Sequence, residues 1–188
     1  MKNIFKYCLI LLMSFQFSQA SEYIIDSAHS NIGFSIKHLM ISNVKGTFKS
    51  FDAELEFDEK TKTFTNMFAT IETTSIDTGI KKRDDHLRSS DFFDVQKYPT
   101  IVFEMTSIND DIITGDITIH GVKKEIKLTS TIHGVIKDSQ GNLRVGFTLE
   151  GALNRKDFGL SWNKLLEGGG LTVGEKVTIT IDVEAIEL

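Results

Sequence analysis

Apolar and polar residues alternate along most of this chain with a period of two, which is the pattern of β-strands that bury one face. Between 143 and 154, for instance, Leu143, Val145, Phe147 and Leu149 alternate with polar residues and glycine. The pattern predicts strands over residues 23–38, 44–57, 64–74, 100–108, 112–120, 124–133, 143–154 and 177–188. A regular strand–helix–strand repeat is missing, so we predict an all-β, antiparallel fold.

The length of these strands favours a closed barrel over a sandwich. Several contain ten or more residues, and ten residues extend about 33 Å at roughly 3.4 Å each. Long strands with a single apolar face hide their edges when the sheet closes on itself. A barrel of eight strands has room for its own side chains or for one small ligand. We therefore predict an eight-stranded antiparallel barrel.

The alternation stops between Ser75 and Pro99, the only proline of the chain. Charged residues crowd the segment 81–88, and Phe92 and Phe93 follow side by side. A segment of this length without strands is often a lid or a binding loop. Burial of one phenylalanine contributes about 1.5–3 kcal/mol. We therefore predict a flap whose two phenylalanines plug an apolar space.

Within this flap we predict a short helix over residues 80–89 that starts at Thr78 or Gly79. Asp84 and Arg88 are four residues apart with the acid first, which predicts a weak ion pair on the helix surface. Ile80 and Leu87 share the face that would meet the sheet.

Residues 1–20 have the features of a secretory signal peptide. Lys2 and Lys6 precede an apolar run over 9–17, and a small-residue cleavage site ends at Ala20. The run is too short for a membrane-spanning helix, which needs about 20 residues. We expect export to the periplasm and a single mature domain over 21–188.

The net charge limits the classes of partner that the mature chain can bind, and its cysteine content excludes a disulfide. Loss of Lys2 and Lys6 leaves 19 basic residues against 26 acidic ones, a net charge of −7. This balance argues against nucleic acid, and against an anionic membrane surface as the main partner. We expect no stable membrane insertion. The single cysteine, Cys8, lies in the predicted signal peptide, so no disulfide supports the fold.

No catalytic or metal-binding motif stands out. A Gly-x-Ser-x-Gly elbow and a phosphate-binding loop are both missing. The five histidines lack zinc-ligand spacing, although His120 and His133 could meet across a predicted hairpin with a turn over 120–123. His38 continues an apolar strand face, so either a protein partner caps it or it touches a ligand. The segment 155–159 lies at the cavity mouth with Trp162, or it forms a salt-bridged loop.

Several motifs, in the same order, resemble those of the YceI-like family, the periplasmic polyisoprenoid-binding proteins of bacteria. They are Asp26–Ser30 with Lys37–Leu39 and Val44–Phe48, Ser75–Gly79 with Arg83–Asp94 and Lys97–Pro99, Gly115–Gly121, and Arg155–Gly159. The resemblance implies a lipocalin-like barrel whose elongated cavity holds a polyisoprenoid, a quinone or a fatty-acid derivative. It implies no enzymatic turnover and no required cofactor. Lys156 stands where relatives often have Ser, which leaves the head group open.

We therefore hypothesise an exported lipid carrier without a metal site. The expected lining residues are Phe34, Ile36, Leu39, Phe51, Phe103, Phe147 and Leu153, with Leu87, Phe92, Phe93 and Trp162 at the mouth and His38 and Arg88 near a head group. Two alternatives stay open: an enzyme acting on a hydrophobic substrate in the same cavity, and a protein-binding module of the periplasm. The oligomeric state, monomer or homodimer, is also open.

Overall fold

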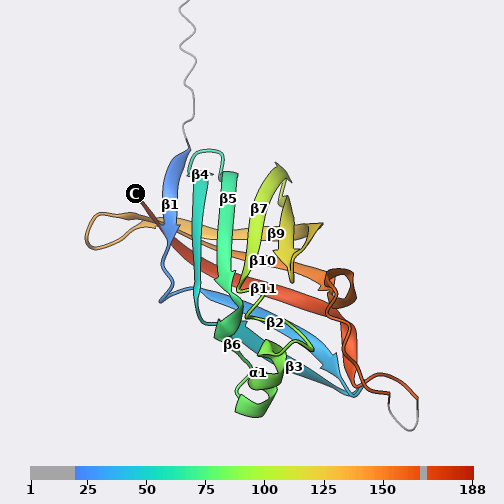
Figure 1. The fold of residues 1–188 in the computed structure, drawn as a ribbon. Helices are drawn as coiled ribbons and strands as arrows, with labels where there is room; N and C mark the ends of the chain where they lie inside the picture. The colour runs from blue at the N-terminus through green and yellow to red at the C-terminus, as the bar shows by residue number, and fades with distance from the viewer. Residues whose placement is uncertain (1–19, 166–168) are drawn as a thin grey trace, which may run out of the picture.

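The computed structural model describes residues 20–165 and 169–188, so residues 1–19 of the predicted signal peptide lie outside the described residues. The predicted all-β, antiparallel fold is confirmed (Figure 1). The strands are β1 (Ser21–Ile25), β2 (Asn31–His38), β3 (Ser42–Phe48), β4 (Phe51–Asp58), β5 (Thr63–Glu72), β6 (Ile76–Asp77), β7 (Thr100–Asn109), β8 (Ile112–Ile119), β9 (Val122–Lys137), β10 (Leu143–Asn154) and β11 (Val173–Glu187).

The sheet closes into the predicted eight-stranded barrel, because β1 pairs with both β4 and β11. Three of the eight positions around the barrel are occupied by interrupted strands. The strands β1 and β2 pair with different parts of β11 and so share one position. The strand β4 pairs with β1, and β3 pairs with β2, so β3 and β4 share the next position. In the same way β6 pairs with β3 and thereby continues the line of β5, which pairs with β4.

Because of these interruptions, two predicted strands are longer than the observed ones. The predicted strand 23–38 breaks after Ile25, where the Asp26 carboxylate accepts a hydrogen bond from the backbone N–H of Ala28 at 3.1 Å. Such a local bond offers the backbone an alternative to the strand ladder. The predicted strand 44–57 breaks at Lys49, whose backbone N–H donates to the carbonyl of Ser75 rather than to a neighbouring strand.

The turn between β8 and β9 is shorter than predicted. Ile119 pairs directly with Val122, so the connection has only two residues, His120 and Gly121, with φ of 52° and 75°. This is the left-handed backbone that two-residue hairpins require. The register carries His133 along β9 to the far end of the hairpin, so the suggested meeting of His120 and His133 is wrong.

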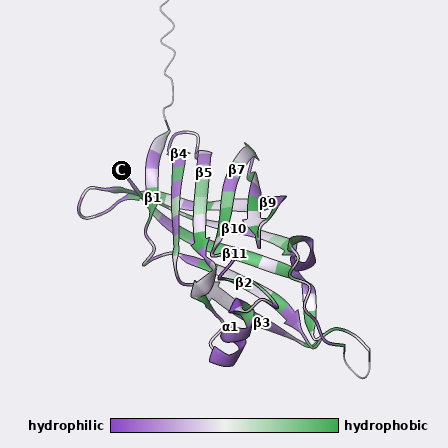
Figure 2. Ribbon diagram, viewed as in Figure 1, coloured by the Kyte–Doolittle hydropathy of each residue, from purple (hydrophilic) through white to green (hydrophobic). Residues whose placement is uncertain are grey.

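The interior of the barrel is filled at the end formed by β1 and the starts of β5 and β10. Tyr23, Phe57, Phe64 and Phe147 are fully buried there, with ring centroids of successive pairs 6.1, 5.2 and 4.8 Å apart. Hydrophobic and hydrophilic segments alternate along the barrel strands, whereas the one α-helix of the described residues is mainly hydrophilic (Figure 2). This packed end holds the fold together, because aromatic side chains bury large apolar areas.

The predicted flap helix is confirmed as α1 (Lys81–Arg88). It starts later than predicted, since its cap is Ile80, one residue after Gly79 and two after Thr78, and Ile80 provides no side-chain cap. The predicted ion pair between Asp84 and Arg88 is wrong. Asp84 is buried and accepts hydrogen bonds from the backbone N–H of Thr78, at 2.9 Å, and from the Thr78 hydroxyl.

Arg88 points the other way, to the chain before the helix. Its Nε donates to the carbonyl of Thr74 at 2.7 Å and its Nη2 to that of Ile76 at 2.5 Å, while Asp85 lies 3.4 Å from Nη1. Charged groups form stronger hydrogen bonds with backbone carbonyls than neutral groups do. Arg88 and Asp84 therefore tie the two ends of α1 to the segment 74–78. Within the described part of the chain, no helix is long and apolar enough to cross a membrane.

Candidate functional site

Beyond the packed aromatic end, the barrel encloses a cavity of about 580 Å³. This volume lies in the range of about 300–1,000 Å³ that is usual for small-molecule sites. Its walls are mainly side chains of the strands β1–β11, almost all of them aliphatic or aromatic. The alternation predicted from the sequence thus places one row of apolar side chains from each strand against a vacant space.

An aromatic cluster forms part of the cavity wall beside α1. The Phe92 and Trp162 ring centroids lie 5.3 Å apart, and the His86 imidazole meets both rings edge-on at 5.0 and 4.9 Å. The next residue, Phe93, packs edge-on against Phe48 of β3 at 5.9 Å. The flap and the segment after β10 are therefore joined by ring contacts. Such contacts exclude water without a covalent or ionic link.

The cavity opens to solvent near α1. Among its lining residues, three have exposed side chains, Lys37, Ile80 and Lys82, and all three lie at this end. The charged or titratable lining residues are basic throughout: Lys37, His38, Lys82, Arg83, His86 and Arg155. No aspartate or glutamate of the described residues lines the cavity. Its few polar groups therefore present positive charge and hydrogen-bond donors.

Among the described residues that line the cavity, Arg155 is the one buried cation. It lies in the 3-10 helix η2 (Arg155–Phe158). Its Nε donates to the carbonyl of Gly174 at 2.7 Å, its Nη1 to that of Leu160, and its Nη2 to that of Val173 at 3.4 Å. Burial lowers the pKa of the guanidinium, and Glu175 partly opposes this effect. The planar fork of arginine suits three carbonyls in different directions, so Arg155 holds the segment after η2 against the start of β11.

The structure places ten of the thirteen predicted site residues on the cavity wall. They are Phe34, Ile36, His38, Leu87, Phe92, Phe93, Phe103, Phe147, Leu153 and Trp162. Three others do not line it. Leu39 lies in the β2–β3 turn and is exposed, Phe51 packs against the core at the start of β4, and the guanidinium of Arg88 is turned toward Thr74 and Ile76. Arg88 is therefore not a head-group ligand in this arrangement.

Five basic lining residues were not predicted as site residues from the sequence: Lys37, Lys82, Arg83, His86 and Arg155. Arg83 lies four residues before Leu87, so the helical spacing already placed it on the inward face. Its Nε and Nη2 donate to the hydroxyl and the carbonyl of Thr78 at 2.7 and 2.8 Å. No local signal identified Arg155 as buried, because its acceptors are carbonyls at up to 19 residues' distance in the chain.

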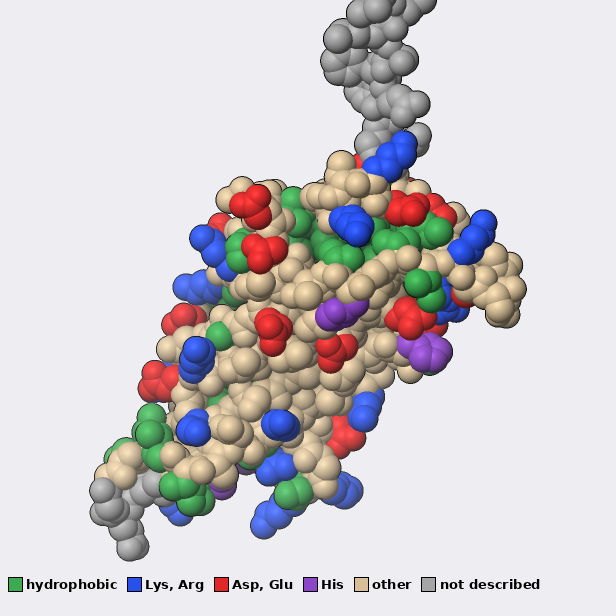
Figure 3. Space-filling view, turned by 180° about the vertical axis from the view of Figure 1, so that it is seen from behind, with side chains coloured by type: hydrophobic (Ala, Val, Ile, Leu, Met, Phe, Trp, Pro, Cys, Tyr) green, Lys and Arg blue, Asp and Glu red, His purple; other side chains and the backbone are tan. Residues whose placement is uncertain are grey.

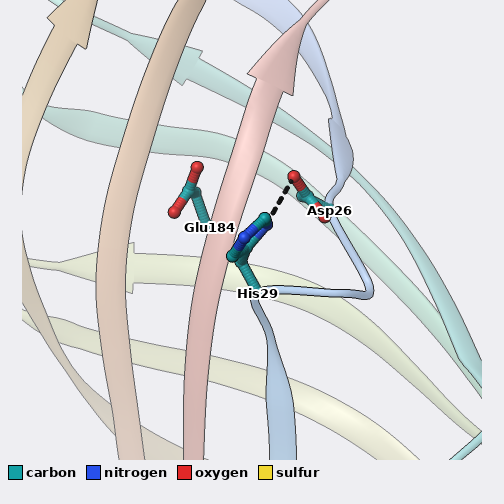
Figure 4. A group of neighbouring side chains, drawn as sticks. All are labelled: Asp26, His29 and Glu184. Atoms are coloured by element: carbon teal, nitrogen blue, oxygen red, sulfur yellow. Dashed lines mark hydrogen bonds and ion pairs between the residues drawn. The ribbon is translucent and has the colours of Figure 1, made fainter. Parts of the chain in front are cut away.

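A second polar cluster lies outside the cavity, at the break between β1 and β2. Asp26, His29 and Glu184 bring their ligand atoms within 4.8 Å of one another (Figure 4). Arg144 already occupies this cluster, with Nη1 2.9 Å from Asp26 and 2.5 Å from Glu184. Hydrogen bonds from His29 and Arg144 lower the pKa of Asp26 to about 2. A guanidinium at this point competes with any metal ion, so we interpret the cluster as an ion-pair network.

Comparison with known proteins places the fold in a family. A family model described as the YceI-like domain matches residues 23–185. The chain belongs to the YceI-like family. Among similar proteins, a UPF0312 protein of Staphylococcus epidermidis is 39% identical over 165 residues, which cover 87% of this chain and 96% of the relative.

Two solved structures have a similar fold. The YceI protein of Campylobacter jejuni is 37% identical, with a TM-score of 0.67 over 87% of this chain and 96% of that one. A domain from Saccharophagus degradans, described as polyisoprenoid-binding, is 14% identical, with a TM-score of 0.64 over 88% of this chain and 98% of that one. At that identity the likeness shows the fold alone, because one fold supports many functions.

Proposed function

We propose that this YceI-like protein is an exported, non-enzymatic carrier that sequesters a long-chain isoprenoid or a related lipid in its barrel. The observation that carries the proposal is the cavity of about 580 Å³, whose walls are mainly apolar and include the aromatic rings of Phe92, Phe93 and Trp162 beside α1. The polyisoprenoid-binding description of the Saccharophagus degradans domain supports the same ligand class by analogy of fold.

Burial of apolar surface is sufficient to hold such a ligand. Each Å² of apolar surface removed from water contributes about 25 cal/mol, so 300 Å² of lipid chain contribute on the order of 7 kcal/mol. The loss of ligand freedom opposes part of this gain. An unbranched or isoprenoid chain fits the walls because they offer few hydrogen-bond partners, and a polar substrate would leave its own groups unpaired there.

The alternative of an enzyme finds less support in the geometry. General acid–base chemistry requires a titratable group within reach of the substrate and matched to its task. Two histidines line the cavity, but His86 is packed between the rings of Phe92 and Trp162 and its Nε2 lies 3.0 Å from Asp91. No carboxylate of the described residues shares the cavity with His38. The arrangement favours binding without turnover.

The test is native purification from the periplasm, organic extraction and mass spectrometry of what the protein carries. We expect one lipid per protein molecule, and its absence from protein produced in its own host would refute the proposal. The variant Ala53→Phe adds a phenyl group on the cavity wall of β4, whereas Glu54→Phe adds one to the outer, exposed face of the same strand. We expect Ala53→Phe to lose the lipid and Glu54→Phe to retain it.

A further inference from the structure

Apolar side chains are exposed to water beside the cavity opening. The turn between β2 and β3 consists of Leu39, Met40 and Ile41, which are 37%, 59% and 83% exposed. Ile80, directly before α1, is 52% exposed and also lines the cavity. Lys37 and His38, directly before the turn, line the cavity too, so the turn and the start of α1 both adjoin the exposed part of its lining. Both lie at the end of the molecule opposite the β4–β5 turn (Figure 1).

The backbone of this turn is unusual for apolar residues. Leu39 and Met40 have φ of 51° and 62°, in the left-handed region that disfavours residues with a Cβ atom. Tight turns of this kind normally contain Gly, Asn or Asp. The other described non-glycine residues with positive φ are all polar: Lys62, Asp94, Asp110 and His120. The β2–β3 turn thus combines a strained backbone with apolar side chains in water, and both features destabilise an isolated soluble domain.

The same opening is surrounded by cations that the protein does not neutralise. Within the described ranges, Lys37, Lys82 and Arg83 form no ion pair, although Lys81 pairs with Asp85 at 2.6 Å. The neighbouring Asp84 is buried against Thr78. Viewed from behind, the lower end of the molecule shows hydrophobic and Lys or Arg side chains next to one another (Figure 3). The opening is therefore locally positive on a chain whose net charge is −5.

We propose that this docking rim, formed by Leu39–Ile41, Ile80, Lys37, Lys82 and Arg83, binds the surface of an anionic lipid membrane. Exposed apolar side chains flanked by cations are the combination that inserts into the headgroup region, where the side chains leave water and the cations meet anionic lipid. Docking in this pose turns the cavity opening toward the bilayer, so that an apolar ligand passes between membrane and barrel without crossing water. The negative charge elsewhere on the chain keeps the binding peripheral and reversible.

The test is flotation of the purified, ligand-stripped protein with vesicles of phosphatidylcholine alone and of phosphatidylcholine mixed with phosphatidylglycerol. We expect binding to the mixed vesicles that weakens as salt is raised. The double variant Met40→Ser, Ile41→Ser should bind at least tenfold more weakly, and Lys82→Ala about fivefold more weakly. Ile136→Ser, at a residue that is 64% exposed near the β9–β10 turn, and Lys60→Ala in the β4–β5 turn are the matched controls and should bind like the unchanged protein.

Three outcomes would overturn the proposal. The protein could fail to bind either kind of vesicle, or the control variants could lose as much binding as the rim variants. Alternatively, light scattering could show that the double variant at Met40 and Ile41 dissociates a dimer while vesicle binding stays the same. That last result would assign the turn to contact between two copies of the chain. Because the vesicles are tested with stripped protein, none of these outcomes depends on which lipid, if any, fills the cavity.

Discussion

One pair of substitutions tests directly whether the barrel is hollow where we describe a cavity. Ala53 on β4 lines the cavity, and its cross-strand neighbour on β5 is another alanine, Ala69. Ala185 on β11 also points inward but is fully buried at the packed end, opposite Val145. Replacement of Ala53 or Ala185 by leucine is the same chemical change in a vacant and in a filled part of one barrel.

The expected changes in the free energy of unfolding have opposite signs for the two variants. At Ala53 the three added carbons enter the cavity, where burial contributes about 0.8 kcal/mol each. The loss of leucine rotamer freedom offsets about 0.5–1 kcal/mol. The net result is a stabilisation of roughly 1.5 kcal/mol. At Ala185 the added carbons meet side chains already in contact, and overpacking destabilises by about 1–3 kcal/mol.

Urea unfolding of ligand-stripped protein, followed by tryptophan fluorescence and circular dichroism, measures both values. Agreement of the two probes establishes that a single two-state free energy applies. The two variants should differ by about 3 kcal/mol, which corresponds to roughly 6–12 °C in Tm for a domain of this size. If Ala53→Leu is destabilised as much as Ala185→Leu, the β4 wall is in contact with opposing side chains and the cavity does not exist there.

Three further predictions concern the arginines. Arg88→Met removes the donors to the carbonyls of Thr74 and Ile76. We expect the free energy of unfolding to fall by about 1–3 kcal/mol and hydrogen exchange in α1 to become faster. Unchanged exchange in α1 would contradict the tethering role of Arg88. Arg144→Gln should flatten the acid limb of the Tm–pH curve. Asp26 stays ionised in the folded protein down to about pH 2. In the unfolded chain it takes up its proton near about pH 4, so its contribution is complete above about pH 4 and declines toward pH 2; an equally steep limb in the variant would refute this. Arg155→Lys keeps the charge but cannot reach three separate carbonyls, so we expect a loss of about 1–3 kcal/mol in thermal unfolding, and a wild-type Tm would show that the fork geometry does not matter.

The alternation of residue types determined much of the architecture. In a strand, every second side chain lies on the same face. This periodicity is sufficient to predict the antiparallel barrel and its inward-facing rows, which contain Phe34, Ile36, Phe103 and Phe147. The interruption of the pattern between 75 and 99 located α1 and the pair Phe92 and Phe93. The alternation and its interruption are both local properties of the chain, so they can be recognised in the sequence without knowing which segments meet in space.

Only the tertiary structure decided which part of the interior is filled. The period of two does not state how far apart opposite walls stand. That distance depends on how the interrupted strands are joined around the barrel. The same limit applies to charge. The sequence does not distinguish Arg88 and Arg155 from exposed arginines, because their hydrogen-bond partners are backbone carbonyls that only folding brings near them. Lys82 lies at the opening because of the position of α1. Hydrogen bonds and ion pairs act over a few ångströms in space, and residue spacing along a strand or a loop does not report such distances.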